Sequence, residues 1–152
     1  MSARTIITVV GIGAIAGLLM GSDTAHALRV GGHAAIVPSS IDGCTSTAYA
    51  AITNNCGSTT TYTIPLPVGT SGSKAVGFRG LGATEANDVE CRGQAMNDAH
   101  TGYWATSWTS MPEFRSVQDV SMGSLYVGGD GAAYMRCKVD DGASLLTVEW
   151  AE

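Results

Sequence analysis

From residue 28 to residue 152, hydrophobic and polar side chains alternate in short runs that glycine and proline interrupt. Period-two alternation with many β-branched and aromatic residues is typical of strands that bury one face. The pattern predicts strands at residues 32–37, 46–53, 58–64, 74–81, 87–95, 101–108, 116–121, 132–139 and 143–150. The alanines of 46–53 also permit a short helix there. We therefore expect an all-β domain, a small antiparallel β-sandwich of the jelly-roll or Ig-like type.

The first 27 residues follow a different pattern. Arg4 precedes an apolar run from Ile6 to Met20, and the segment ends in Ala25-His26-Ala27. This order is typical of a secretory signal peptide, and the apolar run is shorter than the roughly 20 residues of a membrane-spanning helix. We expect residues 1–27 to be a signal peptide cleaved after Ala27. Residues 28–152 would then form one secreted domain, extracellular or periplasmic, without a membrane anchor.

Composition and charge narrow the classes of function. The chain is 45% hydrophobic and 14% charged, which argues against sustained disorder. Its net charge of −5 argues against nucleic acid as a partner, because nucleic-acid binding needs a basic face. The run Gly128-Gly129-Asp130-Gly131 lacks the Lys-Ser/Thr of a phosphate-binding loop and indicates a turn.

Four cysteines, Cys44, Cys56, Cys91 and Cys137, lie in the domain that we expect to be secreted. In an oxidising compartment an even number favours disulfides, and the absence of a C-x-x-C pair argues against zinc. Cys91 and Cys137 both occupy core-facing positions of alternating strands, so we expect them to form a disulfide with each other.

Cys44 and Cys56 are harder to pair. A hairpin of strands 46–53 and 58–64 that turns at Asn54-Asn55 would place Cys44 at its open end and Cys56 at its tip. At about 3.3 Å per residue they would lie more than about 20 Å apart, far beyond the roughly 4.4–6.8 Å that a disulfide spans between Cα atoms. Either this hairpin is wrong, or the two cysteines pair elsewhere, including with another molecule.

Short motifs recur along the domain, namely Gly43-Cys44, Ala48-Tyr49, Asn54-Asn55, Ile64-Pro65-Leu66-Pro67-Val68-Gly69, Val89-Glu90-Cys91 and Ala133-Tyr134-Met135-Arg136-Cys137. In this order, behind a secretory signal, they resemble small secreted β-sandwich proteins of myxobacteria and related bacteria over most of residues 36–150. In that family a cysteine usually precedes Pro-Leu-Pro, where this chain has Ile64 and places Cys56 eight residues earlier. The resemblance implies the fold and secretion, and it implies no activity or site residues.

Groups for catalysis or metal binding are few. His33 and His100 are the histidines of the domain, both in polar or terminal contexts, and no Gly-x-Ser-x-Gly turn accompanies them. Glu85, Asp88 and Glu90 offer oxygen ligands for calcium but lack the spacing of a calcium loop. We expect a turn and a solvated strand face there, with no metal and no cofactor.

Aromatic residues cluster in the predicted strand 101–108. Tyr103, Trp104 and Trp108 lie within it, and on one continuous strand Trp104 and Trp108 share a face while Tyr103 takes the other. Exposed rings of this kind stack on sugars, whereas the alternative is that both tryptophans fill the core.

An uncharged, threonine-rich run at residues 58–63 suits an edge strand that could pair with a neighbour, with Thr59, Thr61 and Thr63 as contacts. We therefore expect a non-catalytic secreted structural or adhesive domain that assembles with copies of itself. The alternative is a carbohydrate-binding module that holds extracellular polysaccharide with Tyr103, Trp104 and Trp108. A small secreted hydrolase is a third, weaker hypothesis, because the sequence offers no paired catalytic groups.

Overall fold

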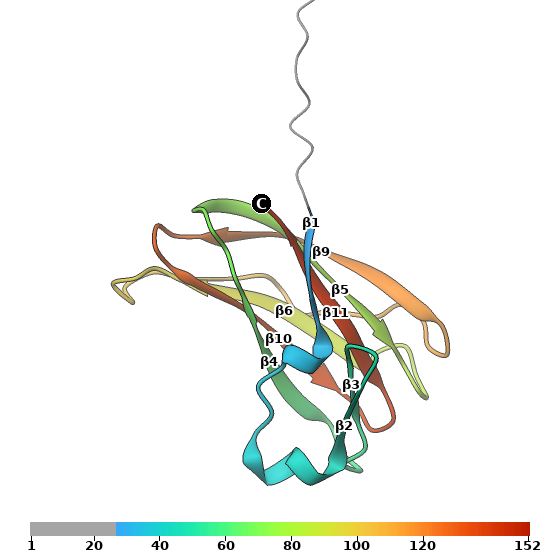
Figure 1. Cartoon of the computed structure of the whole chain (residues 1–152). Helices are drawn as coiled ribbons and strands as arrows, with labels where there is room; N and C mark the ends of the chain where they lie inside the picture. The colour runs from blue at the N-terminus through green and yellow to red at the C-terminus, as the bar shows by residue number, and fades with distance from the viewer. Residues whose placement is uncertain (1–26) are drawn as a thin grey trace, which may run out of the picture.

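A computed structural model describes residues 27–152, so the expected signal peptide lies, apart from Ala27, outside the described residues. The elements in chain order are β1 (Ala27–Gly31), η1 (Gly32–Ala34), η2 (Ser39–Cys44), β2 (Thr45–Ala48), β3 (Ala51–Asn54), β4 (Thr60–Leu66), β5 (Gly72–Leu81), β6 (Val89–Met96), β7 (Tyr103–Ala105), β8 (Thr109–Ser110), β9 (Val117–Val127), β10 (Ala132–Val139) and β11 (Ser144–Ala151) (Figure 1). The two η elements are single 3-10 segments. No helix between residues 27 and 152 has the length and apolar character needed to cross a membrane.

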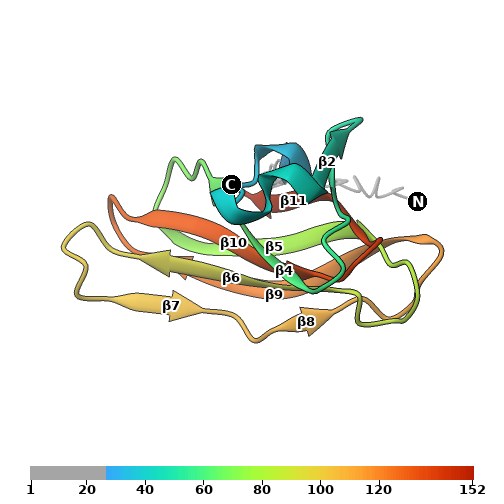
Figure 2. The same ribbon diagram turned by 90° about the horizontal axis from the view of Figure 1, so that it is seen from below.

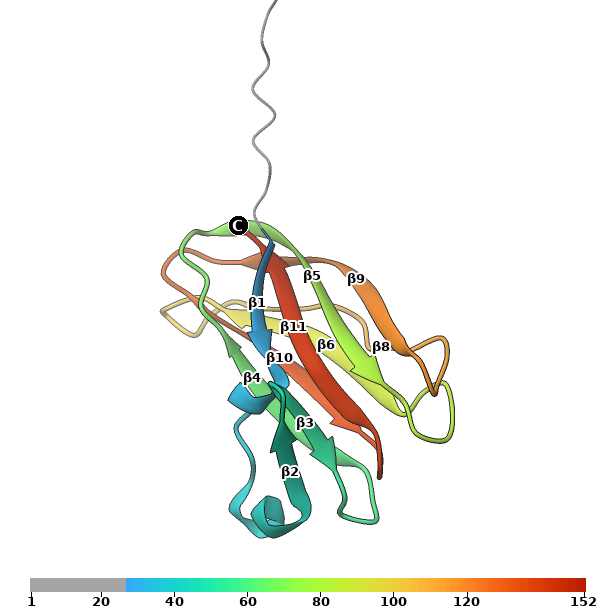
Figure 3. The same cartoon turned by 45° about the vertical axis from the view of Figure 1, so that its right-hand side comes forward.

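The strands form two antiparallel sheets. A six-stranded sheet has the order β2-β3-β11-β5-β9, with β1 also paired to β11, and a five-stranded sheet has the order β4-β10-β6-β7, with β8 also paired to β6. Figure 3 shows β1, β11, β5 and β9 as one layer, with β4, β10 and β6 behind it. The antiparallel β-sandwich expected from the sequence is confirmed.

Side chains between the two sheets make one core. Its largest fully buried members are Tyr62, Phe78, Ile52, Ile64, Met111, Leu125, Met135, Leu145, Val89, Val127, Val139 and Val148. Burial of each such side chain contributes about 1.5–3 kcal/mol relative to exposure. Because side chains alternate along each strand, this burial also fixes which residues the five-stranded sheet presents to solvent on its opposite side.

The segment 46–53 is neither one strand nor a helix, so both expectations for it are wrong. It forms the hairpin of β2 and β3, which turns at Tyr49-Ala50 with both residues at positive φ, 50° and 67°. Such a turn normally carries Asn, Asp or Gly, because other side chains meet the backbone in this conformation. Tyr and Ala give no turn signal in the sequence. Of the two possibilities left open for Cys44 and Cys56, the first holds: the hairpin of 46–53 with 58–64 does not form, because β3 and β4 belong to different sheets.

Two disulfides join the four cysteines. The early turn brings Cys44 and Cys56 to the same open end of the β2–β3 hairpin, where they bond within the chain. Cys91 and Cys137 stand directly opposite each other on β6 and β10 and are fully buried. This second bond ties together the two central strands of the five-stranded sheet. Two intrachain disulfides are typical of proteins from an oxidising compartment.

The strands predicted at 32–37 and 116–121 also differ from the observed elements. Residues 32–37 form η1 and a single bridge from Ile36 to Thr63. Gly32 in this segment packs so closely on Leu145 that a Cβ would lie 2.1 Å from the Leu145 carbonyl oxygen. The strand predicted at 116–121 continues to Val127 through a bulge, in which Gly123 supplies a φ of 82°. Because of the bulge, buried residues fall on even positions before it and on odd positions after it, so the strand does not follow one alternating pattern.

Candidate functional site

The side of the five-stranded sheet that faces away from the core is called the outer face here. On the central strands it consists of Tyr134, Arg136 and Lys138 from β10 and Glu90, Arg92 and Gln94 from β6. Strand register sets them in rows, with Lys138 beside Glu90, Arg136 beside Arg92, and Tyr134 beside Gln94. Their neighbours in the sheet, Met135 and Cys137, are fully buried, so core packing holds these side chains outward.

Tyr103 of β7 extends the outer face at one end. It pairs with Met96 at the end of β6 and is 56% exposed. Its hydroxyl accepts a hydrogen bond from Nε2 of Gln94. Gln94 itself is only 3% exposed, and its Oε1 has no hydrogen-bond partner among the described residues. An acceptor that is buried without a hydrogen-bond partner lowers the stability of the fold.

Trp108 lies on the same outer face, which the strand prediction did not foresee. Along β6, Gln94 pairs with Ala105 and Cys91 pairs with Thr109. The segment from Ala105 to Thr109 therefore advances four residues while β6 advances three, so it contains one extra residue. The extra residue interrupts the predicted strand 101–108 between β7 and β8, which follow one another along β6 (Figure 2). Beyond the extra residue, the positions that point to the core and to solvent are exchanged. Trp108 therefore lies on the same side of the sheet as Arg92 and Tyr103.

The Trp108 ring is held by two cations of the outer face. The Lys138 ammonium nitrogen lies 4.2 Å from the ring centroid, and the Arg92 guanidinium carbon lies 4.8 Å from it. Cation–π contacts of this kind contribute about 0.5–1 kcal/mol at exposed sites. Lys138 also forms an ion pair with Glu90 at 2.8 Å. The indole is therefore fixed on the sheet by interactions with both central strands.

Trp104 is on the opposite side of β7, so the expectation that Trp104 and Trp108 share a face is wrong. Trp104 pairs with Ala95, which points into the core, and its partly buried ring packs against the core. It meets Tyr126 of β9 edge to face, with ring centroids 5.0 Å apart. Trp104 thus closes one side of the sandwich, and of the three predicted ligand-binding residues only Tyr103 and Trp108 come together on one face.

The threonine-rich segment at 58–63 leads into β4, which is an edge strand of the five-stranded sheet. Its threonines make different contacts. Thr59 precedes the strand and donates a hydrogen bond to Asp140. Thr61 and Thr63 are half-buried and lie on the outer face beside Lys138 and Arg136. Part of the free edge is occupied within the chain, because the Ile36 amide donates to the Thr63 carbonyl at 2.8 Å.

The three acidic residues that the sequence offered as oxygen ligands, Glu85, Asp88 and Glu90, do not form one group. Glu90 points to the outer face, and Asp140 instead joins Glu85 and Asp88 in one cluster. Asp88 is 1% exposed, and one of its oxygens accepts backbone hydrogen bonds from Ala83, Thr84 and Glu85 at 2.6–3.1 Å. Burial raises the pKa of Asp88, but the backbone hydrogen bonds from Thr84, Glu85 and Ala83 outweigh it and hold that pKa below its ordinary value. Asp88 is thus an anchor for its loop.

Replacing Asp88 with alanine should lower the free energy of unfolding at pH 7 by about 2–3 kcal/mol, because buried amides lose a charged acceptor. A carboxyl group with a lowered folded pKa stabilises fully above its unfolded pKa of about 3.9, and this contribution is lost as the pH falls through the folded value. The difference between Asp88→Ala and the wild type should therefore shrink in urea titrations below about pH 4. The exposed Asp98→Ala is the control, and an equal loss in both variants would contradict the anchoring role.

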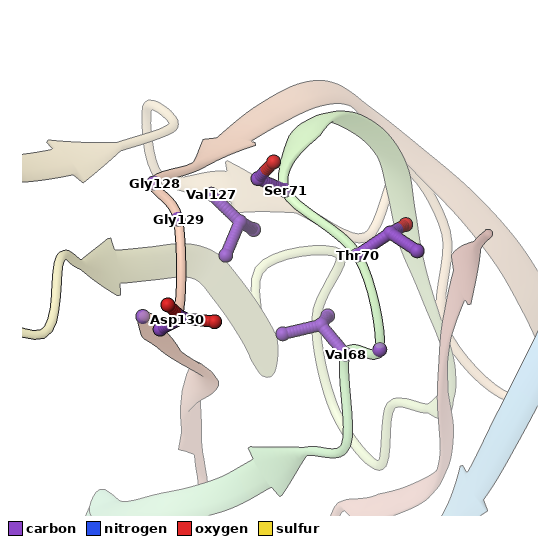
Figure 4. Close-up of a pocket in the computed structure, with 9 residues that line it drawn as sticks. Val68, Thr70, Ser71, Val127, Gly128, Gly129 and Asp130 are labelled. Atoms are coloured by element: carbon purple, nitrogen blue, oxygen red, sulfur yellow. The ribbon is translucent and has the colours of Figure 1, made fainter.

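A pocket of about 350 Å³ opens at one end of the sandwich, between the β4–β5 and β9–β10 connections. Figure 4 shows Val68, Thr70 and Ser71 on one side of it, with Gly128 to Asp130 across from them. No aromatic residue is among the described residues that line it. Two residues that line the pocket contact the carboxylate of Glu152, which accepts hydrogen bonds from the Gly69 amide and the Thr70 hydroxyl. These bonds and one from Lys74 lower the pKa of Glu152 to about 2.

The two histidines of the domain lie apart from these features. The His33 ring contacts the Ala50 carbonyl through Nδ1 at 3.2 Å, and His100 is exposed in the β6–β7 connection at a φ of 56°. Within residues 27–152, neither ring hydrogen-bonds to a serine, a cysteine or a carboxylate. The hydrolase hypothesis gains no support from them.

Comparison with known proteins gives structural neighbours only. The C-terminal CBM6, a carbohydrate-binding module, of the marine laminarinase LamC from Zobellia galactanivorans matches with a TM-score of 0.55 and 12% identity over 84% of this chain and 100% of that chain. A GH26-CBM35 β-(1,4)-mannanase from Podospora anserina matches with a TM-score of 0.53 and 14% identity over 83% of this chain and 28% of that chain. The chain thus spans about 28% of the mannanase's length. No family model and no curated protein matches the sequence.

At this level of identity the matches show the fold, a β-sandwich of the kind found in carbohydrate-binding modules. They also correct the first functional hypothesis. The structural or adhesive assembly domain expected from the sequence is wrong, because the sandwiches that this chain resembles are carbohydrate-binding modules. The alternative hypothesis, carbohydrate binding, is the one that these neighbours favour.

Proposed function

We propose that this protein is a non-catalytic carbohydrate-binding domain that holds polysaccharide on the outer face of its five-stranded sheet. The observation that carries the proposal is the placement of Tyr103 and Trp108 on one face, with the polar side chains of β6 and β10 between and beside them. Sugar rings present apolar C–H faces and hydroxyl edges. Flat aromatic rings next to hydrogen-bonding groups are complementary to both.

The polar groups of the face suit hydroxyl recognition. Gln94 keeps a buried acceptor, Oε1, that no described residue satisfies. The hydroxyl of Tyr103, which Gln94 contacts, can donate to a sugar oxygen while it accepts from the amide. A sugar hydroxyl that bonds to the exposed Tyr103 side chain would therefore extend the Gln94–Tyr103 hydrogen bond toward the ligand.

The strands that carry the face are rigidly held. β6 and β10 pair over eight positions, and the Cys91–Cys137 disulfide joins them from the core side. A site on paired strands loses little conformational entropy when a ligand binds, which favours affinity. Secretion belongs to the same proposal, because polysaccharides are extracellular ligands and two disulfides fit an oxidising compartment.

Native affinity electrophoresis tests the proposal. The secreted protein is run through gels that contain laminarin, β-mannan, β-galactan, alginate or polygalacturonate, with serum albumin as the reference for migration. We expect at least one polysaccharide to retard the protein relative to albumin. Unchanged migration in all five gels would contradict carbohydrate binding.

A further inference from the structure

The outer face has a charge opposite to that of the protein as a whole. The chain has eight Lys and Arg residues against thirteen Asp and Glu, and Arg4 precedes the described residues. Three of the remaining seven cations, Arg92, Arg136 and Lys138, lie together on the outer face. Glu90 is the one carboxylate among the outer-face residues of β6 and β10, and it is paired with Lys138. The outer face of this acidic protein therefore carries more positive than negative charge.

The two arginines are set directly against each other. Arg92 and Arg136 are opposite partners in the β6–β10 ladder, an arrangement that is destabilising for like charges. The ion pairs of residues 27–152 join Arg29, Lys74, Arg79 and Lys138 to carboxylates, and neither Arg92 nor Arg136 is among them. Nε of Arg92 is buried and has no partner among the described residues. The Trp108 contact offsets part of this repulsion for Arg92, but no carboxylate of residues 27–152 neutralises either arginine.

An anionic ligand does give a reason. A guanidinium group binds a carboxylate or a sulfate through two parallel hydrogen bonds, and two such groups side by side concentrate positive potential. Trp108 fixes Arg92 in place from one side, and Thr63 stands beside Arg136 on β4. The cations thus lie next to the same aromatic ring on which a sugar would stack.

We propose that the ligand is an acidic polysaccharide, whose carboxylate or sulfate groups bind Arg92 and Arg136 while its sugar rings lie on Trp108 and Tyr103. This inference rests on the proposed function and adds the chemical class of the ligand. Because the contact is ionic, affinity falls as salt concentration rises.

The test compares pairs of polysaccharides that share a backbone, of which one member carries anionic groups and the other is neutral. Calorimetric titrations measure binding of polygalacturonate, of its fully methyl-esterified form, of dextran sulfate and of neutral dextran to the protein. We expect a charged member of a pair to bind at least tenfold more tightly than its neutral partner. Preference for polygalacturonate over its ester identifies the carboxylate as the bound group, whereas preference for dextran sulfate over dextran identifies the sulfate. Equal affinity within both pairs would overturn the inference.

Variants then assign the effect to the arginines. Arg136→Gln should weaken binding of the preferred charged ligand at least tenfold while leaving the melting temperature equal or higher, because a like-charge neighbour is removed. The exposed Arg115→Gln serves as the matched control and should bind as the wild type does. Wild-type affinity in Arg136→Gln, or single-stranded DNA binding as tightly as the acidic polysaccharide, would also overturn it. If laminarin or mannan binds and acidic chains do not, the proposed function stands and this inference fails, whereas loss of all polysaccharide binding refutes the function itself.

Discussion

Replacing Cys91 and Cys137 together with alanine is expected to lower the free energy of unfolding by about 4 kcal/mol. The disulfide closes a separation of 46 residues, so its loss returns much conformational freedom to the unfolded chain. Both cysteines are fully buried in the middle of the five-stranded sheet, and alanine fills less of that space. Urea denaturation followed by tryptophan fluorescence measures the change.

The second disulfide provides the comparison for this prediction. Cys44 and Cys56 are separated by 12 residues and are only partly buried at the end of the β2–β3 hairpin. By the same chain-entropy relation, their replacement should destabilise by about 3 kcal/mol. A smaller loss of unfolding free energy in the Cys91/Cys137 variant than in the Cys44/Cys56 variant would contradict the larger stabilising role that we assign to the Cys91–Cys137 disulfide.

Removing both aromatic side chains of the outer face, Tyr103→Ala with Trp108→Ala, should weaken polysaccharide binding at least about 100-fold. Large aromatic contacts are common hot spots, and about 1.4 kcal/mol from each ring amounts to that factor. The measurement is a calorimetric titration with whichever polysaccharide retards the wild type most. Trp108 should contribute the larger share, because its loss also frees Arg92 and Lys138 from their positions.

Matched controls separate the loss of a site from the loss of any exposed ring. Tyr49 at the β2–β3 turn and Phe114 in the β8–β9 connection are exposed aromatic residues away from the outer face. Tyr49→Ala and Phe114→Ala should keep wild-type affinity. A thermal melt of the double variant shows whether it remains folded, and equal weakening by the control variants would refute the assignment of the site.

Alternation along single strands was enough to predict the layers of this protein. In β10, Cys137 was expected inside and is buried together with Met135 and Val139, which places Arg136 and Lys138 outside. Each strand buries its own apolar side chains, so an alternation of hydrophobic and polar residues in the sequence indicates which face of that strand is buried.

Features that depend on how two strands pair could not be predicted from the sequence. The single extra residue between Ala105 and Thr109 moves Trp108 to the outer face, and it is visible only against the register of β6. The opposition of Arg92 and Arg136 likewise needs the pairing of strands that are far apart in the chain. The Tyr49-Ala50 turn was missed for another reason, since Tyr and Ala seldom adopt a positive φ and therefore give no turn signal in the sequence.

Amide chemical-shift mapping tests the central claim, polysaccharide binding on the outer face, most directly. The ¹⁵N-labelled protein is titrated with laminarihexaose, mannohexaose and hexagalacturonate in separate series. At least one of them should shift the amides of Gln94, Tyr103 and Arg136 and the indole signal of Trp108, while the amides of β1, β5 and β11 stay in place. Shifts confined to the pocket at 68–71 and 127–131, or to the six-stranded sheet, would contradict the account, as would the absence of shifts in all three series.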